Sequence, residues 1–398
     1  MTINFPRSLT IEACESVIHD VNELDGDSKL ILPVDTERQN FGGLACAIQA
    51  VNTWGRNSES RQLLLRESVK SLEDRVQDVI NMPHKFVAAM WAKSIALEND
   101  EAEDIRKRIN LKAKEAIEEQ ERSGFGQHHG RRCWFAFIDH STKGFDRNFY
   151  FTGPDQKPYI RQPMQIQSII GAMVKQSITV AGGGVVLSED DRNSLGRLFL
   201  ELFLNTHEHG SRGLVRSEWL KPGVRAIYTN GINLANDDAE GMLKNEPALA
   251  KYLKAQAPNL DDKCRFVEIS IVDSGLGYCR RWLADNEELD SVPPMTLEDE
   301  YKIFKRCFKF RQTSTGQGGK GNGLPVVMER LTKLRGFMRV RSGRLALYRD
   351  FISAPYQPND LCDFTDWSSQ KEASEELSEM GSAEGVAITL LVPLESKR

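Results

Sequence analysis

The segment 266–277, FVEISIVDSGLG, restricts the fold of this chain most strongly. Apolar and polar residues alternate along it, which predicts a strand, and this strand ends in an acidic, glycine-rich turn. Asp273 would hold its carboxylate at the mouth of a pocket, where it can accept a hydrogen bond from an exocyclic amine. Gly275 and Gly277 would let the backbone approach a flat base closely. Taken alone, the pattern also fits a strand followed by an ordinary turn.

A second motif lies in the segment 200–210, LELFLNTHEHG. Glu201, Asn205 and His209 are spaced four residues apart, so in a helix they share one polar face. A carboxylate one turn before an amide suits activation of a water beside hydrated Mg²⁺, which prefers a few oxygen ligands, waters and substrate phosphates. An amphipathic helix with a solvated polar stripe is the alternative, and it is favoured when the segment is considered alone.

A third motif is the glycine-rich segment 313–327, TSTGQGGKGNGLPVV, which contains Lys320, Gly321 and Gly323 before an apolar helix start. A loop of this kind presents backbone N–H groups to phosphates at the beginning of a helix. Its spacing is not that of a Walker A loop. A flexible linker is the alternative explanation for the composition.

The fourth motif, 385–393 (GVAITLLVP), is a predicted strand with Thr389 in its middle. The order and spacing of the four motifs resemble those of the GHKL ATPases, also called the Bergerat-fold group. This family includes gyrase B, MutL, heat-shock-90-type chaperones, histidine kinases and anti-sigma serine kinases. The resemblance covers residues 165–398 and is locally closest to the anti-sigma kinases, whose helix likewise ends in Asn, three residues and His-Gly.

The resemblance implies a two-layer α/β sandwich that binds ATP with Mg²⁺. It implies that Glu201 is the general base, Asn205 the Mg²⁺ ligand and Asp273 the carboxylate that accepts from the adenine amine. The implied ATP-binding set also contains Asn205, His209, Asp273, Gly275, Gly277, Lys320, Gly321, Gly323 and Thr389. Residues 278–320 would form a basic lid over the triphosphate. Pro325 departs from the small residue that the family usually has there.

The first part of the chain is predicted to be a smaller α/β unit over residues 1–98, including a helix over 83–98. KLILPVD followed by a helix opening at NFGG resembles a STAS domain, the fold of anti-sigma kinase substrates. At the family's acceptor position this chain has Asn40–Gly43, without a hydroxyl, which disfavours self-phosphorylation there. Residues 99–125 are expected to form a charged helical connector. Residues 126–398 would be the ATP-binding domain with a β-rich N-terminal extension.

Composition restricts the remaining classes of protein. The 398 residues carry 52 Lys and Arg against 57 Asp and Glu, which argues against a wholly cationic surface for nucleic acid. The basic run 331–349 is a candidate nucleic-acid contact, but a sheet hairpin with a solvated face is favoured. No apolar run approaches the ~18 residues of a membrane span, and no signal peptide is recognisable, so a cytoplasmic location is expected. The seven scattered cysteines predict reduced thiols, without disulfides or structural zinc.

Three functions remain open from the sequence. The leading one is hydrolysis of Mg-ATP with Glu201 as the base, coupled to a lid movement that changes contacts with the N-terminal unit or a second subunit. The alternatives are a non-hydrolytic ATP sensor or scaffold, and a serine kinase that acts on a separate protein. A protein partner or a homodimer is expected, and a membrane partner is not.

Overall fold

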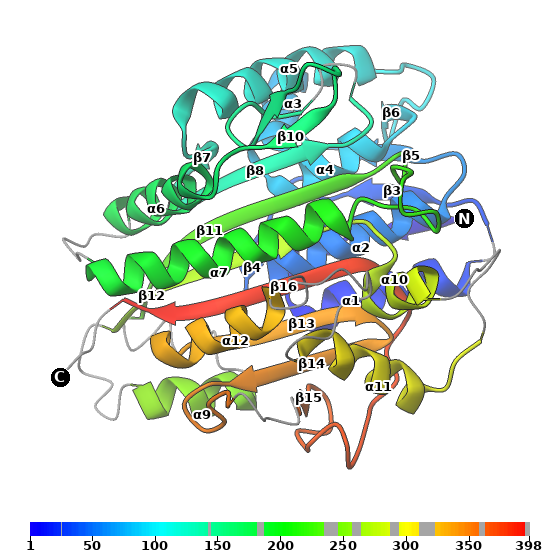
Figure 1. Cartoon of the computed structure of the whole chain (residues 1–398). Coiled ribbons are helices and arrows are strands. Elements are labelled where there is room, and N and C mark those ends of the chain that lie inside the picture. The colour runs from blue at the N-terminus through cyan, green and yellow to red at the C-terminus, as the bar shows by residue number, and fades with distance from the viewer. Residues whose placement is uncertain are drawn as a thin grey trace.

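The computed structural model describes residues 1–24, 26–141, 145–180, 187–234, 246–256, 264–286, 294–309, 323–357 and 363–394. Within these ranges the fold is mixed α/β, with one parallel sheet and one large antiparallel sheet (Figure 1). The expected α/β class is therefore confirmed. No helix within the same ranges is long and apolar enough to cross a membrane.

The N-terminal unit forms a four-stranded parallel sheet in the order β1-β3-β5-β6, while β2 and β4 pair separately. Its elements are β1 (Thr2–Asn4), β2 (Ser8–Leu9), α1 (Ile11–Glu23), β3 (Lys29–Leu32), β4 (Arg38–Gln39), α2 (Gly43–Asn57), β5 (Gln62–Leu65), α3 (Leu72–Asn81), α4 (Pro83–Trp91) and β6 (Ser94–Leu97). The hydroxyls of Thr10 and Ser71 cap α1 and α3 by accepting a backbone N–H hydrogen bond.

The helix predicted over 83–98 is wrong in its second half. α4 begins at Pro83, which is favourable in a first helical turn, and ends at Trp91. The following run Ser94–Leu97 forms β6 and pairs in parallel with β5. Periodicity alone does not distinguish a helix from a strand in such a short apolar run. Its pairing with the sheet makes it a strand.

The second part of the chain builds an eight-stranded antiparallel sheet in the order β15-β14-β13-β16-β12-β11-β8-β7. Its strands are β7 (Gln127–His129), β8 (Arg132–Ile138), β11 (Val224–Leu234), β12 (Cys264–Val272), β13 (Phe337–Gly343), β14 (Leu345–Asp350), β15 (Thr365–Asp366) and β16 (Ala383–Pro393). β9 (Tyr150–Thr152) and β10 (Pro158–Ile160) form a separate hairpin. The predicted strands in β12 and β16 are confirmed.

Helices cover one face of the antiparallel sheet, which we call the front face. They are α6 (Pro163–Val180), α7 (Glu189–Glu208), α10 (Gly277–Asn286), α11 (Leu297–Phe308) and α12 (Gly323–Leu334). Figure 1 shows α6, α7 and α12 lying across this face. Their apolar side chains, such as Phe199 and Phe203, are buried in one core with Ile269, Ile388 and Leu390 from the sheet.

The back face of the antiparallel sheet is covered by the N-terminal unit. Residues of α1, α2 and α4 lie in one core with Leu30 and Leu63 of the parallel sheet and with Trp134 and Val272 of the antiparallel sheet. The short helix α9 (Pro247–Gln256) packs into a neighbouring core that also contains Phe41. The N-terminal unit therefore shares a hydrophobic core with the rest of the chain.

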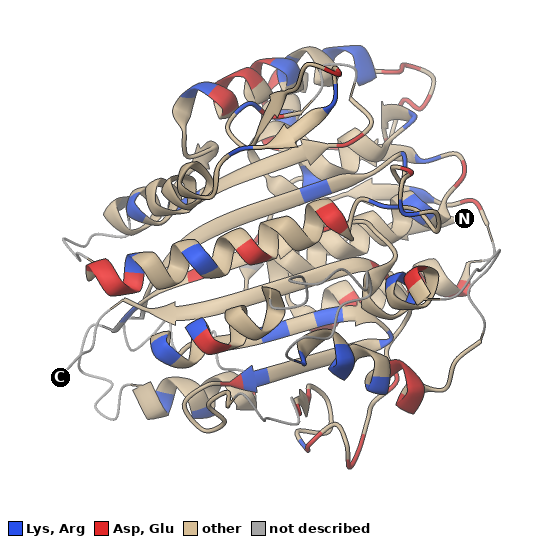
Figure 2. Ribbon diagram, in the orientation of Figure 1, with Lys and Arg blue, Asp and Glu red and all other residues tan. Residues whose placement is uncertain are grey.

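The expected charged connector contains the helix α5 (Arg106–Ser123). Figure 2 shows basic and acidic residues interspersed along it. One side of the helix is nevertheless buried, because Ile109 and Ala113 belong to the core of the N-terminal unit. Near its end, buried Gln120 donates a hydrogen bond to the backbone oxygen of Ala136 in β8 and accepts one from its N–H. The helix of this connector is therefore packed against the rest of the chain, whereas residues 99–104 before it are exposed.

Candidate functional site

The polar residues of the second motif lie near the C-terminal end of α7. Ser188 caps this helix, and three acidic residues in its first turn complement the helix dipole. Glu201 forms an ion pair of 2.7 Å with Arg197, one turn earlier on the same helix. Burial raises the pKa of the Glu201 carboxyl above its ordinary value, while Arg197 acts in the opposite direction. The structure thus places a partly desolvated carboxylate on the predicted face.

The beginning of α12 lies directly against this face. A Cβ atom on Gly323 would lie 3.1 Å from Glu201 Oε2 and 3.7 Å from Asn205 Oδ1. Asn205 Nδ2 is buried and has no hydrogen-bond partner within the described part of the chain. The structure therefore brings the second and third motifs together at Gly323. Lys320 and Gly321 lie outside the described residues.

Asp273 follows β12 and is held by backbone groups on both sides. Its Oδ1 accepts hydrogen bonds from the N–H groups of Gly275, at 2.9 Å, and Val386, at 3.2 Å. Burial raises the pKa of Asp273 to about 6, although these two hydrogen bonds act to lower it. The two hydrogen bonds therefore fix the direction of the Asp273 carboxyl group, and its pKa depends on its surroundings. A side chain that recognises a ligand requires such a fixed direction.

Gly210 joins the end of α7 to the Asp273 turn. A Cβ atom at Gly210 would lie 2.5 Å from the Asp273 carboxyl carbon, and one at Gly275 would collide with the Gly210 carbonyl. The N–H groups of His209 and Gly210 both donate to the Asn205 carbonyl and close the helix end. Contacts thus run from Gly323 through Asn205 and Gly210 to Asp273.

The two remaining predicted residues of this region lie at the margins of the site. His209 ends α7 near Arg216 and Asp285, and burial together with Arg216 lowers its pKa to about 4, so it is neutral at pH 7. Gly277 begins α10 with a φ of +75°, a conformation that favours glycine. His209 meets Asn205 through the backbone hydrogen bond at the end of α7, and both residues adjoin the Asp273 side of the site.

Thr389 does not join the other site residues. Its methyl group lies 3.8 Å from the position of a Cβ on Gly42, at the start of α2, and its hydroxyl accepts a hydrogen bond from Ser270. Thr389 therefore points to the back face, whereas its neighbours Ile388 and Leu390 belong to the front core. Alternate residues of a strand point to opposite faces, so an offset of one residue separates Thr389 from the predicted position.

The predicted lid is largely helical in its described part. In α11, apolar residues including Tyr301, Phe304 and Phe308 are buried in the front core. Among its basic residues, Lys302 pairs with Asp299 at 2.9 Å, and Lys305 lies over the Tyr301 ring. The helices α10 and α11 thus pack on the sheet instead of forming a loop. Residues 287–293 and 310–322 lie outside the described part of the chain.

The candidate nucleic-acid contact at 331–349 is a hairpin inside the sheet. Its residues form the end of α12 and most of β13 and β14. The side chains of Arg339, Arg341 and Arg349 are buried, so they are not available to a phosphate backbone. The prediction of a hairpin is confirmed, but these three arginines are inside the protein and not solvated, whereas Lys333 and Arg335 before the hairpin are exposed.

Gly210, Gly385 and Arg197 were not predicted as site residues, because their roles depend on contacts with Asp273 and Glu201 that form in the folded chain. Gly210 and Gly385 lie against Asp273, and Arg197 pairs with Glu201. The four-residue spacing of Arg197 and Glu201 was available as a signal for their ion pair. The contact of Gly385 crosses between strands and had no local signal.

The donor set suits a metal that takes few protein ligands. Asn205 and Glu201 offer amide and carboxylate oxygens, the chemistry that Mg²⁺ prefers. No group of three or more His, Cys, Asp or Glu residues suited to a metal occurs among the described residues. A Mg²⁺ ion here would therefore depend on substrate phosphates and waters for its other ligands.

Comparisons with protein-family models, curated proteins and solved structures found no match for the chain.

Proposed function

We propose that the chain binds Mg-ATP as a GHKL-type protein, in a two-layer sandwich made by the antiparallel sheet and its front helices. The observation that carries the proposal is the convergence of three sequence motifs. Gly210 lies against Asp273, and Gly323 lies over Glu201 and Asn205. The buried Asn205 Nδ2, which has no partner among the described residues, supports a ligand at this place, because a buried polar group without a partner is costly.

Each residue has a role that its surroundings support. Asp273, fixed through Oδ1, would accept a hydrogen bond from the adenine amine. The N-terminal end of α12 would face the phosphates, where the helix dipole favours negative charge. Asn205 would provide an oxygen ligand to Mg²⁺, which neutralises phosphate charge and orients the triphosphate when bound. Thr389, on the back face, has no part in the proposed site.

Hydrolysis with Glu201 as general base is the leading form of the proposal. A carboxyl group with a raised pKa is a better base near neutral pH than an ordinary one. The ion pair with Arg197 favours the second candidate, a non-hydrolytic sensor, because the pair holds this carboxylate away from a water. Turnover would require Glu201 to leave Arg197.

Transfer of phosphate to the N-terminal unit in cis is not supported. Two features of the N-terminal unit, the parallel sheet and the helix that starts at Gly43, agree with the STAS resemblance. The acceptor position of that family falls at Asn40–Gly43, and Asn40 and Phe41 are buried. Gly42 lies against Arg339 and Thr389, on the back face of the sheet. A kinase activity would therefore act on a separate protein.

The test combines calorimetric ATP binding in Mg²⁺ with phosphate release, for the wild type and Glu201→Gln. Binding by both proteins and release only by the wild type are expected if Glu201 is the base. Binding without release by either protein would favour the sensor. Absence of ATP binding by the wild type would overturn the proposal. Arg197→Ala is the companion variant, and release should rise in it if the ion pair restrains Glu201.

A further inference from the structure

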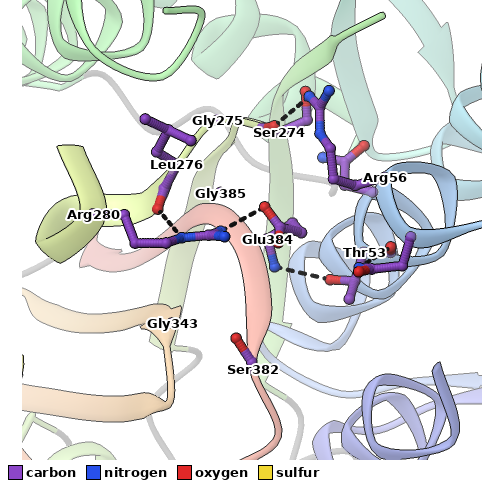
Figure 3. A network of polar contacts seen from close by, with 12 residues as sticks. Thr53, Arg56, Ser274, Gly275, Leu276, Arg280, Gly343, Ser382, Glu384 and Gly385 are labelled. Carbon is purple, nitrogen blue, oxygen red and sulfur yellow. Dashed lines mark hydrogen bonds and ion pairs between the residues drawn. The ribbon is translucent and has the colours of Figure 1, made fainter. Parts of the chain in front are cut away.

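The backbone carbonyls of the Asp273 turn all find hydrogen-bond donors, and two of these donors come from the N-terminal unit. Asn52 Nδ2 donates to the Asp273 carbonyl at 3.2 Å, and an Arg56 guanidinium nitrogen donates to the Ser274 carbonyl at 2.7 Å. The Gly275 carbonyl accepts from the Gly385 N–H, and the Leu276 carbonyl accepts from Arg280. Figure 3 shows Arg56 and Arg280 reaching this turn from opposite sides.

The donors from the N-terminal unit belong to a polar stripe on α2. Gln49, Asn52, Thr53 and Arg56 are spaced so that they share one face of the helix. The first three of these side chains are fully buried. A helix that served only to cover a sheet would be expected to present apolar side chains there, since buried polar groups stabilise only when they are paired.

The same stripe also holds the beginning of β16. Gln49 Nε2 donates to the carbonyls of Arg341, at 3.2 Å, and Glu384, at 3.4 Å. Thr53 Oγ1 accepts from the Glu384 N–H at 3.1 Å, a contact drawn in Figure 3. Two residues later, the Val386 N–H donates to Asp273 Oδ1. The α2 stripe therefore holds both backbone segments that orient the Asp273 carboxyl group.

We propose that the α2 stripe positions Asp273, so that the choice of nucleotide base at the front face depends on the N-terminal unit behind the sheet. The inference rests on the proposed function and assigns Asn52 and Arg56 as positioning residues. They do not contact the base themselves. They fix the backbone from which the Asp273 carboxyl projects, and base recognition requires a fixed direction for that group.

The most informative variant removes the Asn52 donor without also leaving the Trp91 indole unpaired. Asn52 Oδ1 accepts a hydrogen bond from Trp91 Nε1, so Asn52→Leu alone would orphan that indole N–H. Trp91→Phe is therefore the reference protein, and Trp91→Phe with Asn52→Leu is the test protein. Arg56→Met, in the wild-type background, is an independent second variant.

The experiment measures dissociation constants for Mg-ATP, Mg-GTP and Mg-tripolyphosphate in the full chain. For both test variants we expect the preference for ATP over GTP to fall about tenfold relative to its reference protein, which corresponds to one or two hydrogen bonds. Affinity for tripolyphosphate, which has no base, should change less than about twofold. Leu63→Ala, in the core of the parallel sheet, is the control, and it should lower stability without changing base preference.

Hydrogen exchange of the 273–277 amides in nucleotide-free protein gives a readout that does not depend on ATP. Exchange should accelerate in the test variants and stay unchanged in Leu63→Ala. If the wild type fails to bind ATP, the proposed function fails and the exchange result alone decides whether α2 holds the turn. Normal exchange, or unchanged base preference in variants that bind ATP, would overturn the positioning role.

Discussion

The two faces of the antiparallel sheet are both buried, but they are built from different side chains. On the front face, β12 and β16 present Ile269, Ile271, Ile388 and Leu390 to the helices. On the back face, the same strands present Glu268, Ser270 and Thr389, and β13 adds Arg339 and Arg341. A polar strand face normally indicates solvent. Here it indicates a second, specific partner within the chain.

Two of the buried charged residues of the back face, Arg341 and Glu268, contact groups from the N-terminal unit. Arg341 contacts both carboxylate oxygens of Glu15 in α1, at 2.8 and 3.0 Å. Glu268 accepts hydrogen bonds from the N–H of Gly42 and the hydroxyl of Tyr228. Burying a charge is costly unless it is paired, so these contacts define one arrangement of the two parts. The front core would tolerate volume-conserving changes more readily.

The largest effect is expected for Arg341→Met. It leaves Glu15 buried without its partner, so the free energy of unfolding should fall by about 3–5 kcal/mol in urea denaturation. The double variant with Glu15→Leu removes both charges and should recover part of the loss. Ile388→Val, on the front face, should cost only about 1 kcal/mol. Equal losses for the single and double variants would show that the ion pair does not join the two parts.

The next effect is a gain of stability for Asp273→Asn. The carboxyl pKa of about 6 in the folded protein lies above the ordinary 3.8, so ionisation of Asp273 costs folding free energy as pH rises through this window. At pH 7 the cost amounts to about 3 kcal/mol, and asparagine avoids it. The variant should be more stable than the wild type at pH 7 and equal to it below pH ~4, while ATP binding weakens. A pH-independent difference would contradict the assigned cause.

A loss of stability smaller than that of Arg341→Met is expected for Tyr228→Phe on the back face. Its hydroxyl lies 2.7 Å from Glu268 Oε1, and burial already raises the pKa of this carboxyl. Removing the donor should cost about 1–3 kcal/mol, measured by thermal or urea unfolding. Tyr159→Phe is the matched control, because its hydroxyl contacts Asp155 at the surface and should contribute little. Similar losses in the two variants would argue against a specific polar back face.

The sequence predicted the front of the molecule better than the back. α7, β12 and β16 have periodic apolar residues that face a single core, and their order carried the site prediction. β11 was not predicted, because its pattern gains meaning only when it pairs with β8 and β12. The burial of Arg339 and Arg341 was also missed. Alternation along a strand shows that two faces differ, but it does not show what covers each one.

The smallest expected effect tests the side of the sheet on which Thr389 lies. Thr389→Val keeps the shape of the side chain and removes the oxygen that accepts from Ser270 Oγ at 3.0 Å. The loss of stability should be about 1 kcal/mol. Since Thr389 points away from the proposed nucleotide site, ATP affinity should stay within about twofold of the wild type in calorimetry. A large loss of ATP affinity with unchanged stability would instead place Thr389 on the front face, with β16 shifted by one residue against β12.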